Sequence, residues 1–271
     1  MVVEAANVAA PARSLFERSR KPQPSVEPVC EYVFRPLAHL VVVALLPFRV
    51  APPLVVAAGA LTGFAAAAEL ARGQLVAAAV LLQLKTVLDN ADGQLARASA
   101  RVSVFGRYLD SESDLLVNAV LFAALGYRTH EPILAAAGFA LLTLLLGINF
   151  NLKHLHRVAN AEPAETMPRA RGRAAAVLER IYALVYAPQD RLLERFAAWR
   201  ICRLGVEPRT YHDRATLAVV AWFGLSTQLL VFGVFVAAGA PTAYCWLLVA
   251  MGTLLVPLEL RRGRRSRQRS R

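Results

Sequence analysis

The sequence predicts an all-α polytopic membrane protein with six transmembrane helices and an N-terminal helix at the membrane interface. Hydrophobic residues make up 56% of the 271-residue chain, and its mean hydropathy is +0.43. Both values are typical of membrane proteins rather than soluble domains. The apolar residues also gather in six stretches, each close to the roughly 20 residues that an α-helix needs to cross a bilayer core.

The predicted transmembrane helices are separated by recognisable breaks. A proline pair begins the first, a tight turn at Arg72-Gly73 separates it from the second, and Gly239-Ala240 joins the last two as a hairpin. Before them, residues 31–47 are apolar on one side and too short to span comfortably, so we expect an interfacial helix there. The six predicted spans are residues 52–71, 74–98, 106–127, 132–155, 215–238 and 241–260.

The polar segment between the fourth and fifth spans is expected to form two amphipathic helices at residues 175–186 and 191–201, separated by Pro188. They are expected to rest on the membrane surface, with a lid over the active site as the alternative. The predicted organisation is a flexible cytoplasmic N-terminus (1–29), the interfacial helix with four spans (30–156), a cytoplasmic insert (157–213), two spans (214–260) and an Arg-rich cytoplasmic tail (261–271).

Positive charge sets the expected orientation. The net charge is +12, and arginines concentrate between the second and third spans and after the fourth, whereas the opposite-side connections hold only Arg72, Arg128 and His130. The positive-inside rule then puts both termini and the active site on the cytoplasmic side of the cell membrane. The basic residues suit anionic lipid headgroups, so nucleic acid is not expected as a partner.

Four aspartates interrupt the apolar pattern of the second and third spans. Asp89 and Asp92 are three residues apart and Asp110 and Asp114 four apart, so each pair shares one helix face, while Glu112 falls on the far side. Ionised carboxylates at this depth are costly unless something compensates them. Their hard oxygen ligands suit Mg²⁺ or Mn²⁺, and two ions roughly 3.5–4 Å apart could clamp a pyrophosphate.

Residues between the two aspartate pairs suit phosphate binding. Gly93 lets a nucleotide or phosphate approach the backbone, Arg97 offers a bidentate fork, and Ser103 offers a hydroxyl. Lys85 lies one helical turn before Asp89 inside the second span. An intramembrane ion pair with Asp89 is the simpler interpretation of Lys85, and contact with an anionic substrate is the alternative.

The pattern D-x-x-D-G-x-x-A-R-x8-G-x-x-x-D-x-x-x-D, from Asp89 to Asp114, resembles the signature of the CDP-alcohol phosphotransferase (CDP-alcohol phosphatidyltransferase) family. The resemblance covers residues 31–155 and is weak over the insert. It implies transfer of a substituted phosphate group from a CDP-alcohol to an acceptor alcohol, with release of CMP, in phospholipid or phosphodiester biosynthesis. The donor would be CDP-diacylglycerol or a CDP-linked polyol, and a homodimer is one arrangement that the resemblance allows.

The same resemblance implies a role for each motif residue. Gly93, Arg97 and Ser103 would bind the CDP moiety, and Asp114 would contact the second metal ion and act as general base. The metal ligands would be Asp89, Asp92, Asp110 and Asp114.

One departure from the family pattern is the apolar start of the first span, Pro52-Pro53-Leu54-Val55-Val56, where many members carry polar side chains for the cytidine. Lys153 and Arg157, four residues apart at the end of the fourth span, could simply reach the interface. Relatives with a phosphorylated acceptor often place basic residues there, so these two are predicted to bind an acceptor such as a phosphorylated polyol.

Two other classes compete with this interpretation. An intramembrane prenyltransferase also uses aspartates, metal and pyrophosphate, but would place its second acidic cluster far along the chain, whereas these four lie between residues 89 and 114. A transporter, or a catalytically lapsed family member, is the non-enzymatic alternative. Transporters often contain internal repeats with broken helices, and no such repeat is evident in the sequence.

Overall fold

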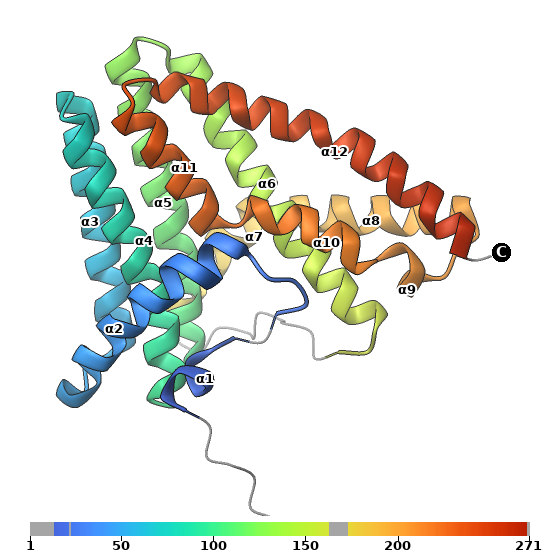
Figure 1. Ribbon diagram of the computed structural model, residues 1–271, viewed down its shortest axis with the longest axis horizontal. Coiled ribbons are helices and arrows are strands. Elements are labelled where there is room, and N and C mark those ends of the chain that lie inside the picture. Colours follow the sequence, from blue (N-terminus) through green and yellow to red (C-terminus); the bar gives the residue numbers. More distant parts are fainter. Residues whose placement is uncertain (1–13, 22, 163–172, 270–271) are drawn as a thin grey trace, which may run out of the picture.

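The computed structural model describes residues 14–21, 23–162 and 173–269, and these residues form helices and connecting turns with no strand (Figure 1). The all-α prediction is confirmed. The longest helices are α3 (Pro52–Arg72), α4 (Leu75–Ala98), α5 (Val104–Thr129), α6 (Pro132–Ala159) and α12 (Pro241–Arg269), and α11 (Leu225–Ala237) precedes α12 in a hairpin.

The site depends on a bundle of three neighbouring helices, α3, α4 and α5, which pack on one another along their lengths (Figure 1). Helix α2 (Arg35–Leu45) crosses α4 on one side, and α11 packs against α4 on another. Helix α6 packs against both α5 and α12. The main core has mostly Leu, Ala and Phe side chains from these helices, including Leu70, Leu82, Leu121, Phe122, Leu142 and Phe232.

Five helical segments among the described residues are long and apolar enough to cross a membrane. They are Cys30–Phe48, Pro52–Arg72, Pro132–Ala159, Pro208–Ala237 and Pro241–Arg269. Helices α4 and α5 have sufficient length but are not among the five, because they contain the charged residues of the motif. The chain is an integral membrane protein, and the count of six spans with an interfacial first helix stays a prediction.

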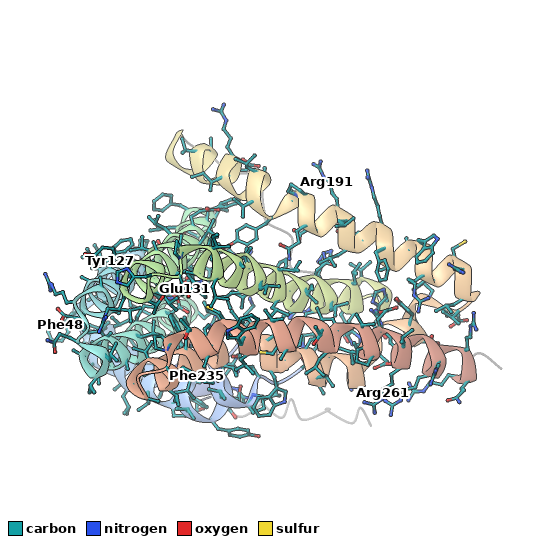
Figure 2. All side chains as sticks on the ribbon, turned by 90° about the horizontal axis from the view of Figure 1, so that it is seen from above. Phe48, Tyr127, Glu131, Arg191, Phe235 and Arg261 are labelled. Atoms are coloured by element: carbon teal, nitrogen blue, oxygen red, sulfur yellow. The ribbon has the colours of Figure 1, made fainter. Side chains whose placement is uncertain are left out.

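The insert forms α7 (Arg173–Val185) and α8 (Ala187–Leu204), close to the two helices predicted there. Helix α8 begins before Pro188 because a proline is tolerated in the first helical turn, where its missing N–H has no partner to lose. Helix α6 lies between α8 and α12 (Figure 2). The short helices α9 (Pro208–Tyr211) and α10 (Arg214–Val220) lead from α8 to α11, and residues 163–172 lie outside the described part.

Helix α12 continues through most of the C-terminal arginines and ends at Arg269. Arg262, in the segment predicted to be a cytoplasmic tail, is buried. Its Nε donates to the Tyr211 carbonyl at 2.7 Å, and its guanidinium lies 3.7 Å from the centre of that tyrosine ring. The Tyr211 hydroxyl in turn donates to Glu259 Oε1 at 2.6 Å. A cation with this many partners is stable away from water.

The described part of the N-terminus packs on the bundle. Helix α1 (Leu15–Ser19) begins with a capping box between Ser14 and Glu17 and contacts α4. Further along, Glu27 lies at the start of α11, where its Oε1 accepts hydrogen bonds of 2.8 Å from both Thr227 N and Thr227 Oγ1. Gly224 leaves room for this carboxylate. The flexible N-terminus predicted for residues 1–29 stays a prediction, since residues 1–13 lie outside the described part.

Two glycines of α3 provide a matched test of the bundle packing. A Cβ at Gly63 would lie 3.0 Å from Val117 Cγ2 and closer still to Cγ1, whereas a Cβ at Gly59 would have only ordinary contacts, the nearest being Leu88 Cβ at 3.6 Å. Alanine gains the same helix propensity at both positions, so their difference isolates the clash. We expect Gly63→Ala to be less stable than Gly59→Ala by about 1–3 kcal/mol. Thermal unfolding in one detergent measures this, and equal midpoints would contradict the packing.

The Glu27 contact generates a pH-dependent prediction. Burial raises the pKa of Glu27 above its ordinary value of 4.5, against the opposing effect of the Thr227 hydrogen bonds and the nearby Lys153 and Arg35 charges. The native state then holds this proton more tightly than the unfolded chain, so the contribution of Glu27 to stability is present below pH 4.5 and is lost as pH rises through the raised pKa.

Glu27→Gln keeps an acceptor for Thr227 and removes this titration. Its melting temperature is expected to rise relative to wild type between pH 4.5 and neutral pH. The control is Glu194→Gln at an exposed position. The difference in melting temperature between this variant and wild type should not rise with pH. If the difference in melting temperature between Glu27→Gln and wild type stayed constant across that pH range, the proton linkage would be ruled out.

Candidate active site

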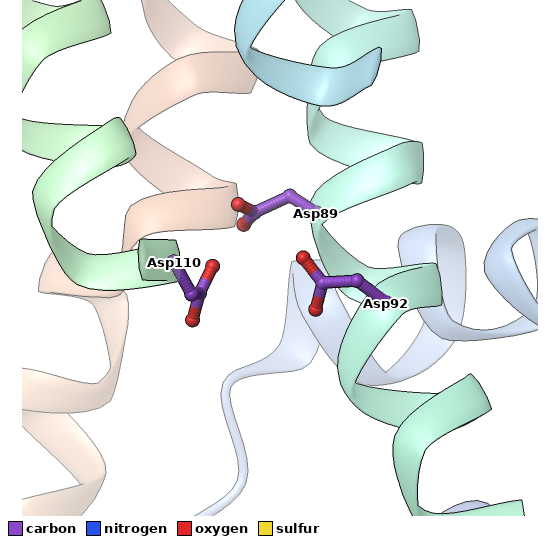
Figure 3. A group of neighbouring side chains, drawn as sticks. All are labelled: Asp89, Asp92 and Asp110. Carbon is purple, nitrogen blue, oxygen red and sulfur yellow. The ribbon is translucent and has the colours of Figure 1, made fainter. Parts of the chain in front are cut away.

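Three of the four motif aspartates converge between α4 and α5. One carboxylate oxygen each from Asp89, Asp92 and Asp110 lies within 4.8 Å of the other two. Figure 3 shows Asp89 and Asp92 projecting from α4 toward Asp110 on α5. The short connection from Ser99 to Ser103 turns the chain back, so that faces predicted separately from the two spacings meet.

The fourth aspartate is held by a buried lysine. Lys85 is 2% exposed, and its Nζ donates to Asp89 Oδ1 at 3.1 Å and to Asp114 Oδ1. The predicted ion pair with Asp89 is therefore confirmed. The second pair, with Asp114 on the neighbouring helix, was not predicted, because residues 29 positions apart can be paired only by the packing of α4 on α5.

The aspartate triad fits a metal ion. Asp92 Oδ2 is buried and has no hydrogen-bond partner among the described residues. A buried carboxylate oxygen without a donor is costly, and a divalent cation is the compensation that an all-oxygen site of this kind accommodates. Asp89, Asp92 and Asp110 could thus hold a metal ion.

A cavity of about 490 Å³ opens beside the triad. The predicted CDP contacts Gly93, Arg97 and Ser103 all line it, together with Asp92 and Asp110. The other side chains on its wall include the apolar start of α3 and several cations: Pro52, Pro53, Val56, Lys21, Arg101 and Arg107. Cations beside an acidic cluster that could hold a metal ion are surroundings that suit a nucleotide pyrophosphate.

Two of the predicted CDP contacts already have partners in the fold. Arg97 Nε donates to the Ser19 carbonyl at 2.6 Å, and its guanidinium lies close to Gly93, where a Cβ would be 3.3 Å from Arg97 Nη1. Ser103 caps α5, accepting a hydrogen bond from Gly106 N at 3.0 Å. Their CDP-binding roles stay predictions, and these contacts hold both side chains on the cavity wall.

A second cavity of about 270 Å³ lies at Asp114. Asn118, Thr143 and Asn149 line it, and the insert contributes Tyr186 and Asp190. Asn118, Thr143, Tyr186 and Asp190 were not predicted from the sequence, because polar side chains from separate helices form no pattern along the chain.

The predicted acceptor residues Lys153 and Arg157 line neither of these two cavities. Lys153 Nζ instead donates to Gln23 Oε1 at 3.3 Å. Their acceptor-binding role therefore stays a prediction.

Comparison with known proteins agrees with this geometry. The family model described as CDP-alcohol phosphatidyltransferase matches residues 48–206, more than half of the chain. The chain belongs to the CDP-alcohol phosphatidyltransferase family.

Two curated archaeal relatives are similar to parts of the chain. The "Bifunctional IPC transferase and DIPP synthase" of Thermococcus kodakarensis is 45% identical over 71 residues, covering 26% of this chain and 16% of the relative. The "Archaetidylinositol phosphate synthase" of Methanothermobacter thermautotrophicus is 36% identical over 107 residues, covering 38% of this chain and 50% of the relative. The chain thus spans no more than half the length of these relatives, and no solved structure matches it.

The Lys85 ion pairs predict a stability that depends on metal. Lys85→Met leaves Asp89 and Asp114 without their buried cation, so we expect a loss of about 3 kcal/mol or more in protein stripped with a chelator. Mg²⁺ should recover part of this loss, because it compensates the same carboxylates. Thermal unfolding with and without Mg²⁺ is the measurement.

The control for this experiment is Arg72→Met, which breaks the exposed pair between Arg72 and Glu69 and should cost less than about 1 kcal/mol. If Lys85→Met were no less stable than this control, the buried ion pairs would not be important for the fold.

Proposed function

We propose that the chain transfers a substituted phosphate group from a CDP-alcohol to an acceptor alcohol and releases CMP, in phospholipid or phosphodiester biosynthesis. The observation that carries this proposal is the convergence of Asp89, Asp92 and Asp110 beside a cavity that Gly93 and Arg97 also line. Family membership supports the reaction type. The family match also favours this reaction over the prenyltransferase and transporter alternatives.

In the proposed reaction, Asp89, Asp92 and Asp110 would hold Mg²⁺ or Mn²⁺, and Asp114 would contribute to a second ion. Such ions, when bound, would neutralise pyrophosphate charge and make the acceptor hydroxyl more acidic. The three carboxylates lie on two helices packed together, so their positions are preorganised. Arg97 would offer its guanidinium to the pyrophosphate, and Gly93 would allow close approach to the backbone.

The acceptor oxygen forms a bond to the β-phosphorus of the CDP-alcohol while the bond from that phosphorus to the bridging oxygen breaks, and CMP leaves with that oxygen. Asp114 takes the hydroxyl proton. Lys85 Nζ donates a hydrogen bond to Asp114 Oδ1, and this bond fixes the orientation of the carboxylate. A general base needs this fixed geometry as much as it needs an appropriate basicity.

The acceptor would enter the cavity at Asp114, whose hydroxyl and amide side chains suit a polyol. The name of the Methanothermobacter relative includes inositol phosphate, which supports a phosphorylated polyol as acceptor. Lys153 and Arg157 stay the predicted contacts of the acceptor phosphate, although they do not line this cavity. The donor would be CDP-diacylglycerol or a CDP-linked polyol.

We further propose the topology of six spans and an interfacial helix, with α4 and α5 crossing the membrane despite their charged residues. Both termini and the active site would face the cytoplasm, because Arg97, Arg101 and Arg107 lie at the same end of α4 and α5. Both cavities would then lie on the cytoplasmic side of the membrane.

Asp114→Asn tests the catalytic assignment. CMP release by the chain in lipid nanodiscs with Mg²⁺ should fall at least about 100-fold, because general-base catalysis typically contributes that much. The donors tested would be CDP-diacylglycerol and CDP-inositol. Each would be combined with glycerol phosphate, inositol phosphate and free polyols as acceptors.

The matched control is Glu112→Gln, the same acid-to-amide change two residues away on the far face of α5, which should keep most activity. Equal losses in the two variants, or no metal-dependent CMP release by wild type with any pair, would overturn the proposal.

A further inference from the structure

We propose that residues 14–21 and 23–29 form a strap across the nucleotide cavity, and that Lys21 on this strap binds the phosphates of the CDP-alcohol. The inference rests on the proposed function, because it concerns the donor site of that reaction. It assigns a substrate contact to the polar N-terminal segment, whose sequence contains no recognisable motif.

The strap is attached to the bundle at three points on three different helices. The Ser19 carbonyl accepts a hydrogen bond from Arg97 Nε on α4. Gln23 Oε1 accepts one from Lys153 Nζ on α6, and Glu27 Oε1 accepts two from Thr227 at the start of α11. Ser19 is completely buried. Because Ser19 and Gln23 are both attached, Lys21 between them has a defined position.

Lys21 lies between the first two attachment points and lines the 490 Å³ cavity with Asp92, Arg97 and Asp110. The neighbouring Arg18 and Arg20 do not line it; Arg20 pairs with Glu31, and Arg18 is exposed. The strap therefore contributes one cation to a wall that otherwise comes from α3 to α6 and the connection between α4 and α5. A lysine ammonium is a compact charge with three donors, which suits a phosphate oxygen that is not already bound by a metal ion.

The strap also acts on Arg97. Since the Ser19 carbonyl binds Nε, the guanidinium is held by the strap on one edge and can present its terminal nitrogens to a ligand. Ser19 is in this respect a positioning residue, and Lys21 is a binding residue. A donor held by both would meet the metal-binding aspartates with its pyrophosphate already oriented.

The proposal is tested by calorimetry, which measures the binding of CDP to the full chain in nanodiscs with Mg²⁺. Lys21→Gln should weaken CDP binding about tenfold, the loss expected for one charge-assisted hydrogen bond. Lys21→Arg keeps the charge and should bind within about threefold of wild type. Arg18→Gln removes one exposed positive charge from the same segment and should bind CDP like wild type.

The possible outcomes distinguish a failure of the proposed function from a failure of the Lys21 contact alone. Wild-type protein that does not bind CDP would overturn the proposed function and this proposal with it. Wild-type binding with equal affinities for Lys21→Gln and Arg18→Gln would overturn the strap contact alone. Weak binding by Lys21→Arg as well as Lys21→Gln would also overturn it, because the loss would then come from a disturbed segment and not from the missing charge.

Discussion

The interaction on which the structure depends is the bonding of one buried lysine to two aspartates on neighbouring helices. Lys85 bonds Asp89 on its own helix and Asp114 on α5, so the fold brings its own cation to a place where carboxylates would otherwise repel one another. This arrangement divides the four acids into two groups. Asp114 is held by the lysine, while Asp92 and Asp110 converge with Asp89 on a site that suits a metal ion.

The packing of α3 also helps to hold the acidic faces of α4 and α5 together. Gly63 faces Val117 of α5, and its missing side chain also leaves space beside the lysine stem, since a Cβ there would lie 3.4 Å from Lys85 Cγ. Small residues at a helix interface let backbones approach closely without requiring a hydrophobic driving force, which lipid does not supply. Close approach of α3 to both α4 and α5 is what keeps the acidic faces of the latter two helices together.

The remaining polar side chains of α4 attach the surrounding elements. Asn90 Nδ2 donates to Ser226 of α11 at 3.0 Å, and its Oδ1 accepts from Cys30 Sγ at 3.1 Å. Gln94 Nε2 donates to the Arg35 carbonyl at 3.1 Å. Helix α4 thus presents carboxylates to α5 on one face and amides to α2 and α11 on another. Hydrogen bonds in a low-dielectric interior are strong, so the helix at the centre of the site is also the best connected.

The sequence by itself determined the helical class, the apolar segments and the two pairs of aspartates, because helix periodicity and hydropathy are local properties. It also indicated the pair of Lys85 with Asp89, one turn apart on one helix. Only the tertiary structure decided that Lys85 also binds Asp114, that the Ser19 carbonyl accepts a hydrogen bond from Arg97, and that Lys21 lines the cavity beside the aspartate triad. The burial of the predicted tail residue Arg262 was likewise decided there. These contacts join residues far apart in the chain, and their partners depend on how helices pack, which no spacing rule along one helix contains.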